Sequence, residues 1–294
     1  KLRMGPIAQR LSELLAQPVE YVPESVGPDV EKRLQALNPG QVALLENVRF
    51  HPEEEKNDPA FAEQLAKLAD IYVDDAFGTA HRAHASTEGV AHHLPAVAGL
   101  LMQKEIDVLD QVLSNPARPF VAIIGGAKVS DKMGVLGNLL TKVDALLIGG
   151  GMANTFLVAI GCSVGESLLE KDKVTEAREL IHQADEHKVQ LMLPRDVIAA
   201  SEFSNDAETK AVSIQEVPDG WRILDVGPVT VQQYCEVIVK AKTVVWNGPL
   251  GVFEMPKFAE GTLGVAQAVA NCSGLTVVGG GDSVAALEQA GLAS

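Results

Sequence analysis

Short apolar runs alternate along the chain with longer segments in which apolar residues recur every three or four positions. Continuous short runs are typical of buried strands, whereas the longer spacing is typical of amphipathic helices. The predicted strands are Val42–Leu45, Ile71–Val73, Phe120–Ile124, Ala145–Ile148, Gln190–Leu193, Thr243–Trp246 and Leu275–Val278. The predicted helices are Ile7–Ala16, Val30–Leu37, Pro59–Leu68, Lys104–Leu113, Val129–Leu140, Val174–His187, Val229–Ala241, Phe258–Val269 and Val284–Ala290.

This alternation of strands and helices indicates an α/β fold. Strands that are apolar at nearly every position are buried on both faces, as parallel strands joined by helical crossovers are. The sequence therefore predicts doubly wound parallel sheets covered by helices on both sides. No repeat with a period of about 20 to 50 residues underlies the pattern.

A boundary between two lobes is predicted in the middle of the chain. An amphipathic helical segment ends at Ser114-Asn115-Pro116, just before a strongly apolar strand. A length of 294 residues agrees with two domains. The predicted parts are a first lobe over 1–103, a hinge helix and linker over 104–118, and a second lobe over 119–294. One continuous sheet is the alternative.

Charge and composition exclude several classes of protein. The chain has 39 acidic and 24 basic residues, a net charge of −15, which opposes binding to nucleic acid or an anionic membrane. Its three cysteines are widely spaced, so a disulfide framework or a thiolate zinc site is not indicated, and a reducing cytoplasm fits best. No uninterrupted apolar segment is long enough to cross a bilayer. An anionic ligand must therefore meet a local basic cluster.

Glycine clusters follow four of the predicted strands. They occur at 125–126, 149–151, 248 and 279–281. Ligands of open α/β sheets bind outside the carboxyl ends of the strands, where glycine lets backbone N–H groups approach a phosphate. One such cluster is usually a simple turn, but four together indicate a nucleotide crevice. Neither a Walker A box nor a dinucleotide fingerprint after the first strand is present.

Two lysines stand beside the first of these clusters. Lys128 and Lys132 are four residues apart at the predicted start of a helix, which would place both ammonium groups on one helix face. A lysine at a helix N-terminus opposes the helix dipole, so a bound anion explains the pair. Two solvated surface lysines are the alternative.

Acidic residues follow the third and fourth clusters. Asp282 and Ser283 open the last predicted helix, where their simplest role is capping, worth about 1 kcal/mol. The functional alternative is that Asp282 supplies an oxygen to Mg²⁺, which is usually held by one or two carboxylates together with substrate phosphates. Glu254 is a candidate acceptor of hydrogen bonds from a ribose.

Two loops of the first lobe carry arginines just after strand ends. Arg49 and Arg82 have the planar guanidinium that suits carboxylate and phosphate recognition. His81 and His84 lack a third metal ligand nearby, so we expect them to position the loop or contact an anion. The acidic run at 53–58 is interpreted as a solvated loop and helix start.

Taken together, these segments resemble phosphoglycerate kinase. The matching motifs occur in the family's order across nearly the whole chain. They are Leu-Glu-Asn-Val-Arg-Phe at 45–50, Asp-Ala-Phe-Gly-Thr-Ala-His-Arg-Ala-His-Ala-Ser at 75–86, Gly-Gly-Ala-Lys-Val-Ser-Asp-Lys at 125–132, Gly-Gly-Gly-Met-Ala-Asn-Thr-Phe at 149–156, Val-Trp-Asn-Gly-Pro-Leu-Gly-Val-Phe-Glu at 245–254 and Gly-Gly-Gly-Asp-Ser at 279–283.

The resemblance implies two Rossmann-like lobes joined by a hinge helix, the first binding 3-phosphoglycerate and the second Mg-ATP or Mg-ADP. The implied reaction is reversible phosphoryl transfer from ATP to the carboxylate of 3-phosphoglycerate, giving ADP and 1,3-bisphosphoglycerate. It also implies a cytoplasmic, glycolytic monomer.

The resemblance assigns roles to particular residues. Arg49, Arg82 and His81 would bind the glycerate substrate. Lys128 would follow the transferring phosphoryl group, and Lys132 would bind nucleotide phosphate. The other residues implied to bind the nucleotide, with Asp282 also binding its metal, are Gly126, Gly150, Asn247, Glu254, Gly280, Gly281, Asp282 and Ser283.

Two segments of the family pattern have no counterpart in this sequence. They are the amino-terminal strand with its Asp-x-Asn motif and following arginines, and a carboxy-terminal glycine-rich segment with a returning helix. We expect this sequence to be part of a larger molecule, because exposed apolar strand edges invite aggregation. One alternative is a catalytically inactive, truncated nucleotide-binding relative. The other, an NAD-dependent oxidoreductase, explains the glycines but not the paired lysines or the arginine loops.

Overall fold

The chain is divided into two compact units, residues 1–110 and 111–294. The structure, a computed structural model, describes residues 2–292. Helix α5 (Leu100–Ser114) crosses the boundary between the units. The predicted hinge role of this segment stays a prediction.

The first unit contains two separate parallel strand pairs. Strand β1 (Val19–Val22) pairs with β2 (Val42–Leu45), and β3 (Tyr72–Asp74) pairs with β4 (Ala96–Ala98). The unit's α-helices before α5 are α1 (Gly5–Leu15), α2 (Pro28–Gln35), α3 (Pro52–Glu55) and α4 (Pro59–Ala66). Its short helical turns are η1 (Val48–Phe50), η2 (Phe77–Thr79), η3 (Ala85–Gly89) and η4 (Val90–His92).

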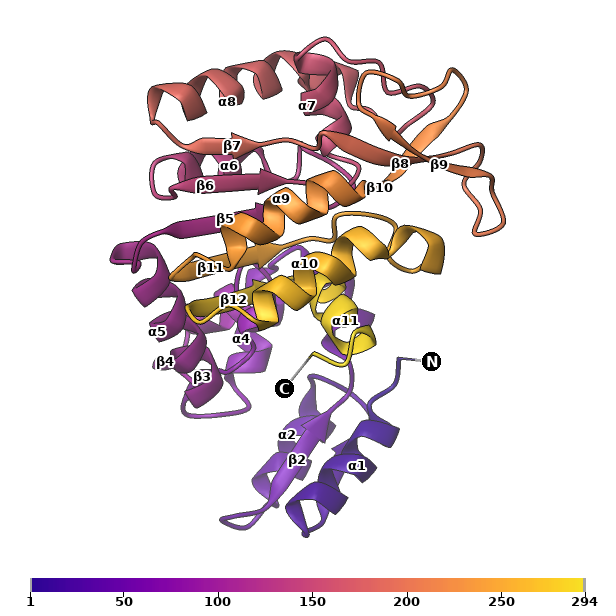
Figure 1. The fold of residues 1–294 in the computed structure, drawn as a ribbon. Coiled ribbons are helices and arrows are strands. Elements are labelled where there is room, and N and C mark those ends of the chain that lie inside the picture. Colours follow the sequence, from indigo (N-terminus) through magenta and orange to yellow (C-terminus); the bar gives the residue numbers. More distant parts are fainter. Residues whose placement is uncertain (1, 293–294) are drawn as a thin grey trace. The chain divides into compact units, whose positions relative to one another are not determined.

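The second unit is built on a five-stranded parallel sheet in the order β12-β11-β5-β6-β7 (Figure 1). The strands are β5 (Phe120–Ile124), β6 (Ala145–Ile148), β7 (Gln190–Met192), β11 (Thr243–Asn247) and β12 (Leu275–Gly279). The chain starts at the central β5, moves outward to β7, then returns to β11 on the other side. The strand order therefore reverses between β5 and β11, and crevices of doubly wound sheets form at such a point.

Alternate side chains of the central strands enter two different cores. Phe120, Ala122 and Ile124 of β5 pack in one core, whereas Val121 and Ile123 pack in the other. The first core is covered by α6 (Met133–Leu140), α7 (Ala153–Ala159) and α8 (Val174–Glu186). The second is covered by α9 (Pro228–Ile238) and α10 (Glu260–Ala270). Both faces of the sheet are thus buried, which confirms the predicted α/β class.

A second sheet of this unit was not predicted. Strands β8 (Asp196–Ala200), β9 (Thr209–Ser213) and β10 (Arg222–Val226) form an antiparallel sheet in the order β10-β8-β9. Strands β9 and β10 mix polar and apolar residues, and the apolar run at 197–200 in β8 was not assigned to a strand. The prediction of parallel sheets therefore holds for the five-stranded sheet and is wrong for this region.

None of the helices in residues 2–292 is long and apolar enough to cross a membrane.

The side chain of Tyr234 connects α9 to strands β6 and β7 of the parallel sheet. Its fully buried hydroxyl lies 2.7 Å from the carbonyl oxygen of Ile148 and 3.0 Å from that of Met192. We expect Tyr234→Phe to lower the free energy of unfolding of the second unit by about 1 to 2 kcal/mol, because buried carbonyl groups lose their donor. Urea unfolding followed by tryptophan fluorescence measures this, since Trp221 and Trp246, the chain's two tryptophans, both lie in the second unit. An unfolding curve that matches the wild type would contradict it.

Candidate active site

A cavity of about 380 Å³ lies at the carboxyl edge of the parallel sheet. We call it the glycine cavity. It brings together eight of the predicted site residues, from the loops after β5, β11 and β12. Its lining comprises Gly125, Gly126, Ala127, Lys128, Asp131, Lys132, Asn247, Gly248, Pro249, Gly280, Gly281, Asp282 and Ser283.

The loops after β5 and β11 are joined through their main chains. The N–H of Gly125 donates to the carbonyl of Asn247 over 3.0 Å, and the N–H of Gly126 donates to that of Pro249 over 3.0 Å. A Cβ at Gly125 would overlap the carbonyl oxygen of Pro249, so only glycine permits this approach. The contact fixes two walls of the glycine cavity relative to each other.

Helix α11 (Gly281–Gln289) begins at this cavity with uncapped amides. No side chain caps it, and its first helical hydrogen bond is donated by Val284 to the carbonyl of Gly280 over 3.1 Å. The N–H groups of Gly281, Asp282 and Ser283 therefore lack partners within the helix. These amides and the helix dipole favour an anion at this position.

The capping interpretation of Asp282 and Ser283 is wrong. Both residues lie inside the first turn of α11, after Gly280, which has a φ of +91° and precedes the helix. The Ser283 hydroxyl accepts a hydrogen bond from the N–H of Gly248 over 2.6 Å. Ser283 thus connects the last two glycine loops, and the exposed Asp282 carboxylate lines the cavity.

Lys128 and Lys132 lie in a turn before α6, because that helix begins at Met133 and not at Val129. The prediction that a shared helix face brings them together is therefore wrong. The turn nevertheless places both residues in the lining of the glycine cavity. The Lys132 ammonium donates to the side-chain oxygen of Asn247.

Glu170 anchors this lysine-bearing turn. The hydroxyl and the N–H of Ser130 donate to its carboxylate over 2.6 and 3.0 Å. These bonds, chiefly the one from the hydroxyl, and the nearby charge of Lys128 hold the pKa of Glu170 below its ordinary value. Glu170 therefore stays ionised at neutral pH and can hold the turn in place.

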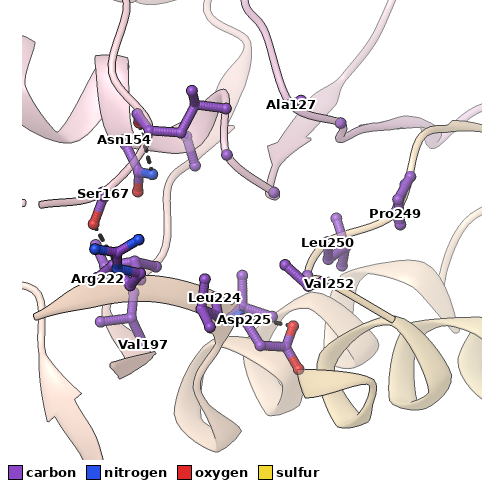
Figure 2. Close-up of a pocket in the computed structure, with 18 of the residues that line it drawn as sticks. Ala127, Asn154, Ser167, Val197, Arg222, Leu224, Asp225, Pro249, Leu250 and Val252 are labelled. Carbon is purple, nitrogen blue, oxygen red and sulfur yellow. Dashed lines mark hydrogen bonds between the residues drawn. The ribbon is translucent and has the colours of Figure 1, made fainter. Parts of the chain in front are cut away.

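A second cavity, of about 570 Å³, adjoins the first and is wide enough for a small-molecule ligand. We call it the apolar cavity (Figure 2). Gly126, Ala127, Pro249 and Asp282 line both cavities. The predicted residues Gly150 and Glu254 line the apolar cavity. Its other walls come from Leu157, Leu168, Val197, Phe203, Leu224, Leu250 and Val252, together with Gly151, Ala153, Asn154, Glu166, Ser167, Pro194, Arg222, Ile223, Asp225, Val226 and Gly251.

The predicted substrate residues of the first unit lie on two exposed loops. Arg49 belongs to η1, and its Nε is 3.9 Å from a carboxylate oxygen of Glu55. Arg82 follows η2 and donates to the ring of His81 over 3.4 Å. The shared role of Arg49, Arg82 and His81 in substrate binding stays a prediction.

Two buried carboxylates hold these arginine loops. Glu46, 5% exposed, accepts hydrogen bonds from Tyr21, Met4, Asn47 and Arg3 over 2.6 to 3.1 Å, and the Tyr21 bond is the main reason that its pKa falls to about 2. Glu54, 2% exposed, accepts from the hydroxyl and N–H of Ser86 over 2.6 and 2.9 Å. The interpretation of residues 53–58 as a solvated loop is therefore wrong for Glu54.

Sequence reasoning missed most of the apolar cavity. Leu168, Val197 and Leu224 lie outside the motifs, and two of them lie on the antiparallel sheet that was not predicted. Asn154 lies three residues after the second glycine cluster, within the motif at 149–156, and its place in that motif was the available signal. Glu46 lies in the motif at 45–50, which was the available signal, whereas Glu54 belongs to an acidic run of a kind that is common at helix starts.

Comparisons with known proteins agree with this geometry. The family model described as phosphoglycerate kinase matches residues 1–294. The chain is 61% identical to the phosphoglycerate kinase of Moorella thermoacetica and 60% identical to that of Herpetosiphon aurantiacus. Both matches cover 100% of this chain, and they cover 75% of the first protein and 74% of the second. The solved phosphoglycerate kinase of Coxiella burnetii is 45% identical, with a TM-score of 0.84 over 99% of this chain and 73% of that one.

The family model and these relatives define the class of the protein, and the glycine-lined crevice of the α/β sheet agrees with it: the chain is a kinase, a phosphotransferase. It belongs to the phosphoglycerate kinase family. The family membership confirms the function predicted from the motifs and removes the oxidoreductase alternative. The chain spans about three quarters of the length of these relatives.

The buried carboxyl of Asp225 should make the stability of the second unit depend on pH. Burial raises the pKa of its carboxyl from 3.8 to about 7, although the N–H groups of Gly261 and Val226 partly oppose the shift. The folded state therefore holds the proton more tightly than the unfolded state, and stability is lost as the pH rises through this interval. We expect the free energy of unfolding to fall by roughly 2 to 4 kcal/mol, relative to Asp225→Asn, between pH 4 and pH 8.

Urea unfolding of both proteins at several pH values, followed by tryptophan fluorescence, measures this dependence. Only the difference between the two pH profiles is used, so any constant effect of the substitution cancels. Parallel profiles across the interval would show that Asp225 does not titrate as described.

Proposed function

We propose that the second unit binds Mg-ATP or Mg-ADP, with the polyphosphate in the glycine cavity and the adenosine in the apolar cavity. The observation that carries this proposal is the continuity of the two cavities through Gly126, Ala127, Pro249 and Asp282. A ligand with one polyanionic end and one largely apolar end matches that pair. The ribose would lie near the exposed carboxylate of Glu254, which can accept hydrogen bonds from its hydroxyl groups.

We propose that the chain transfers the terminal phosphoryl group to the carboxylate of 3-phosphoglycerate, bound by Arg49, Arg82 and His81 of the first unit. The phosphoryl transition state spreads negative charge over equatorial oxygens, so positioning and cationic groups supply most of the catalysis. Lys128, as a mobile point charge, follows the transferring group, and Lys132 with the amides of α11 binds the remaining phosphates. A carboxylate acceptor is already ionised and needs no general base.

The metal enters with the nucleotide as part of the substrate. Within residues 2–292 no group of three or more His, Cys, Asp or Glu side chains is arranged to hold a metal ion. Asp282 supplies one carboxylate beside the free amides of α11, and nucleotide phosphates would complete the oxygen ligands that Mg²⁺ prefers. The donor set of the glycine cavity therefore fits a magnesium nucleotide better than free magnesium.

The same proposal places the enzyme in the cytoplasm as a monomer that works in glycolysis. The widely spaced cysteines suit a reducing compartment. The acidic net charge makes nucleic acid and anionic membranes poor partners.

Substitutions of the two lysines are expected to affect nucleotide binding and phosphoryl transfer differently. We expect Lys132→Ala to weaken Mg-ADP binding about tenfold or more, since it removes a charge that contacts bound phosphate. Lys128→Ala should lower kcat about 10²-fold while changing the KM for ATP far less, because its charge acts mainly in the transition state. Isothermal titration calorimetry and steady-state kinetics measure the two effects.

Lys240→Ala is the matched control, because Lys240 is exposed at the end of α9 and outside both cavities. It should bind Mg-ADP as the wild type does. Wild-type behaviour of both Lys128→Ala and Lys132→Ala would refute the assigned roles, and calorimetry without heat for the wild type would refute nucleotide binding itself.

A further inference from the structure

One buried side chain joins the two loops that carry the predicted substrate residues of the first unit. Arg49 lies in η1, three residues before α3, and Arg82 lies three residues before η3. Glu54, on α3, accepts hydrogen bonds from the hydroxyl and the N–H of Ser86, on η3, over 2.6 and 2.9 Å. We call this contact the Glu54–Ser86 bridge. It joins segments that are 32 residues apart in the chain and belong to one compact unit.

Main-chain hydrogen bonds lead from Glu54 back to Arg49. The N–H of Glu54 donates to the carbonyl of His51 over 3.1 Å, and the N–H of His51 donates to that of Val48 over 3.0 Å. The N–H of Arg49 donates to the side-chain oxygen of Asn47 over 3.1 Å, which caps η1. The backbone between Arg49 and Glu54 therefore consists of consecutive hydrogen-bonded turns, which transmit the position of one residue to the other.

The segment from Ser86 back to Arg82 is fixed in a similar way. The hydroxyl of Thr87 donates to the carbonyl of Arg82 over 2.8 Å, and the N–H of His84 donates to the same carbonyl over 3.0 Å. Ala85, which precedes Ser86, is completely buried. The backbone of Arg82 therefore follows the position of Ser86.

The Glu54–Ser86 bridge is an expensive way to join two loops. The Glu54 side chain is only 3% exposed, and burying a carboxylate is unfavourable unless donors bond to it. The ring of His84 lies beside it, with Nδ1 3.8 Å from a carboxylate oxygen. Hydrogen bonds have preferred distances and angles, so the bridge sets one spacing between the loops, which a non-directional apolar contact would not do. A second contact between these segments, from Asn57 to Glu88, is exposed and lies farther from both arginines along the chain.

We propose that Glu54 is a positioning residue for the glycerate substrate: through Ser86 it sets the spacing of the two loops, so that Arg49 and Arg82 bind the same ligand. This inference rests on the substrate binding stated under the proposed function. A ligand with a phosphate and a carboxylate gains affinity from a fixed spacing, because the two guanidinium groups then need little rearrangement to bind it. Glu54 acts through the arginines and not on the reacting atoms.

Steady-state kinetics of Glu54→Gln tests the proposal. Glutamine keeps the size of the side chain but replaces one accepting oxygen by an NH₂ group, so one of the two bonds from Ser86 is lost. We expect the KM for 3-phosphoglycerate to rise about tenfold, while kcat and the KM for ATP change by less than about twofold. Glu53→Gln is the matched control and should keep the wild-type values, because Glu53 is the exposed neighbour of Glu54 on α3.

Variants of Ser86 test the same bridge from its other side. Ser86→Ala removes only the hydroxyl donor and should raise the KM for 3-phosphoglycerate about fivefold. Ser86→Thr keeps the donor and should stay within about twofold of the wild type. Ser86 lines a cavity of about 360 Å³ in the first unit, which gives space for the added methyl group. The double variant Glu54→Gln/Ser86→Ala should raise this KM by less than the product of the two single effects, because both changes break one contact.

A merely structural role of Glu54 gives a different result. Partial unfolding lowers the concentration of active protein, which lowers the apparent kcat and leaves both KM values unchanged. A wild-type KM for 3-phosphoglycerate in Glu54→Gln would overturn the proposal, as would an equal rise in the KM for ATP. If Glu54→Gln does not fold, Ser86→Ala and Ser86→Thr decide by the same criteria.

The wild-type chain separates this inference from the proposed function. Isothermal titration calorimetry with 3-phosphoglycerate gives the affinity of the wild type and of each variant directly. If the wild type binds this ligand and the variants bind it equally well, only the positioning role of Glu54 is overturned. If the wild type does not bind it, the substrate assignment of the proposed function fails, and the positioning role fails with it.

Discussion

The candidate site depends on a main-chain contact at the point where the strand order reverses. The loops after β5 and β11 approach so closely that their amides and carbonyls bond directly, at Gly125, Gly126 and Pro249. The N–H of Met152, before α7, donates in turn to the carbonyl of Gly126 over 3.0 Å. Both cavities form around these main-chain bonds, and side-chain bonds such as the one between Ser283 and the N–H of Gly248 add to them.

The parts of the fold that follow from local patterns were predictable from the sequence. Strands β2, β5 and β6 have the predicted bounds, because continuous apolar runs in a buried sheet are distinctive. The glycine clusters indicated the crevice correctly, since parallel strands end at one edge. Lys128, Lys132 and Asp282 line that crevice, although the local geometry differs from the helix and cap that the spacing indicated.

What the sequence did not predict depends on contacts between distant segments. Helix α7 is buried on nearly all sides, so it lacks the amphipathic spacing by which helices are recognised. Strands β9 and β10 of the antiparallel sheet carry mixed patterns, and the burial of Glu54 depends on Ser86, which lies 32 residues away.

The antiparallel sheet also affects how such a site can diverge. It is inserted between β7 and β11, has a small core of its own around Ala200, Leu224 and Phe258, and contributes Val197 and residues 222–226 to the apolar cavity. The glycine cavity, by contrast, is lined by residues at the carboxyl ends of β5, β11 and β12, including the first turn of α11. Sequence changes within the antiparallel sheet can therefore reshape the wall of the apolar cavity while the lining of the glycine cavity stays the same.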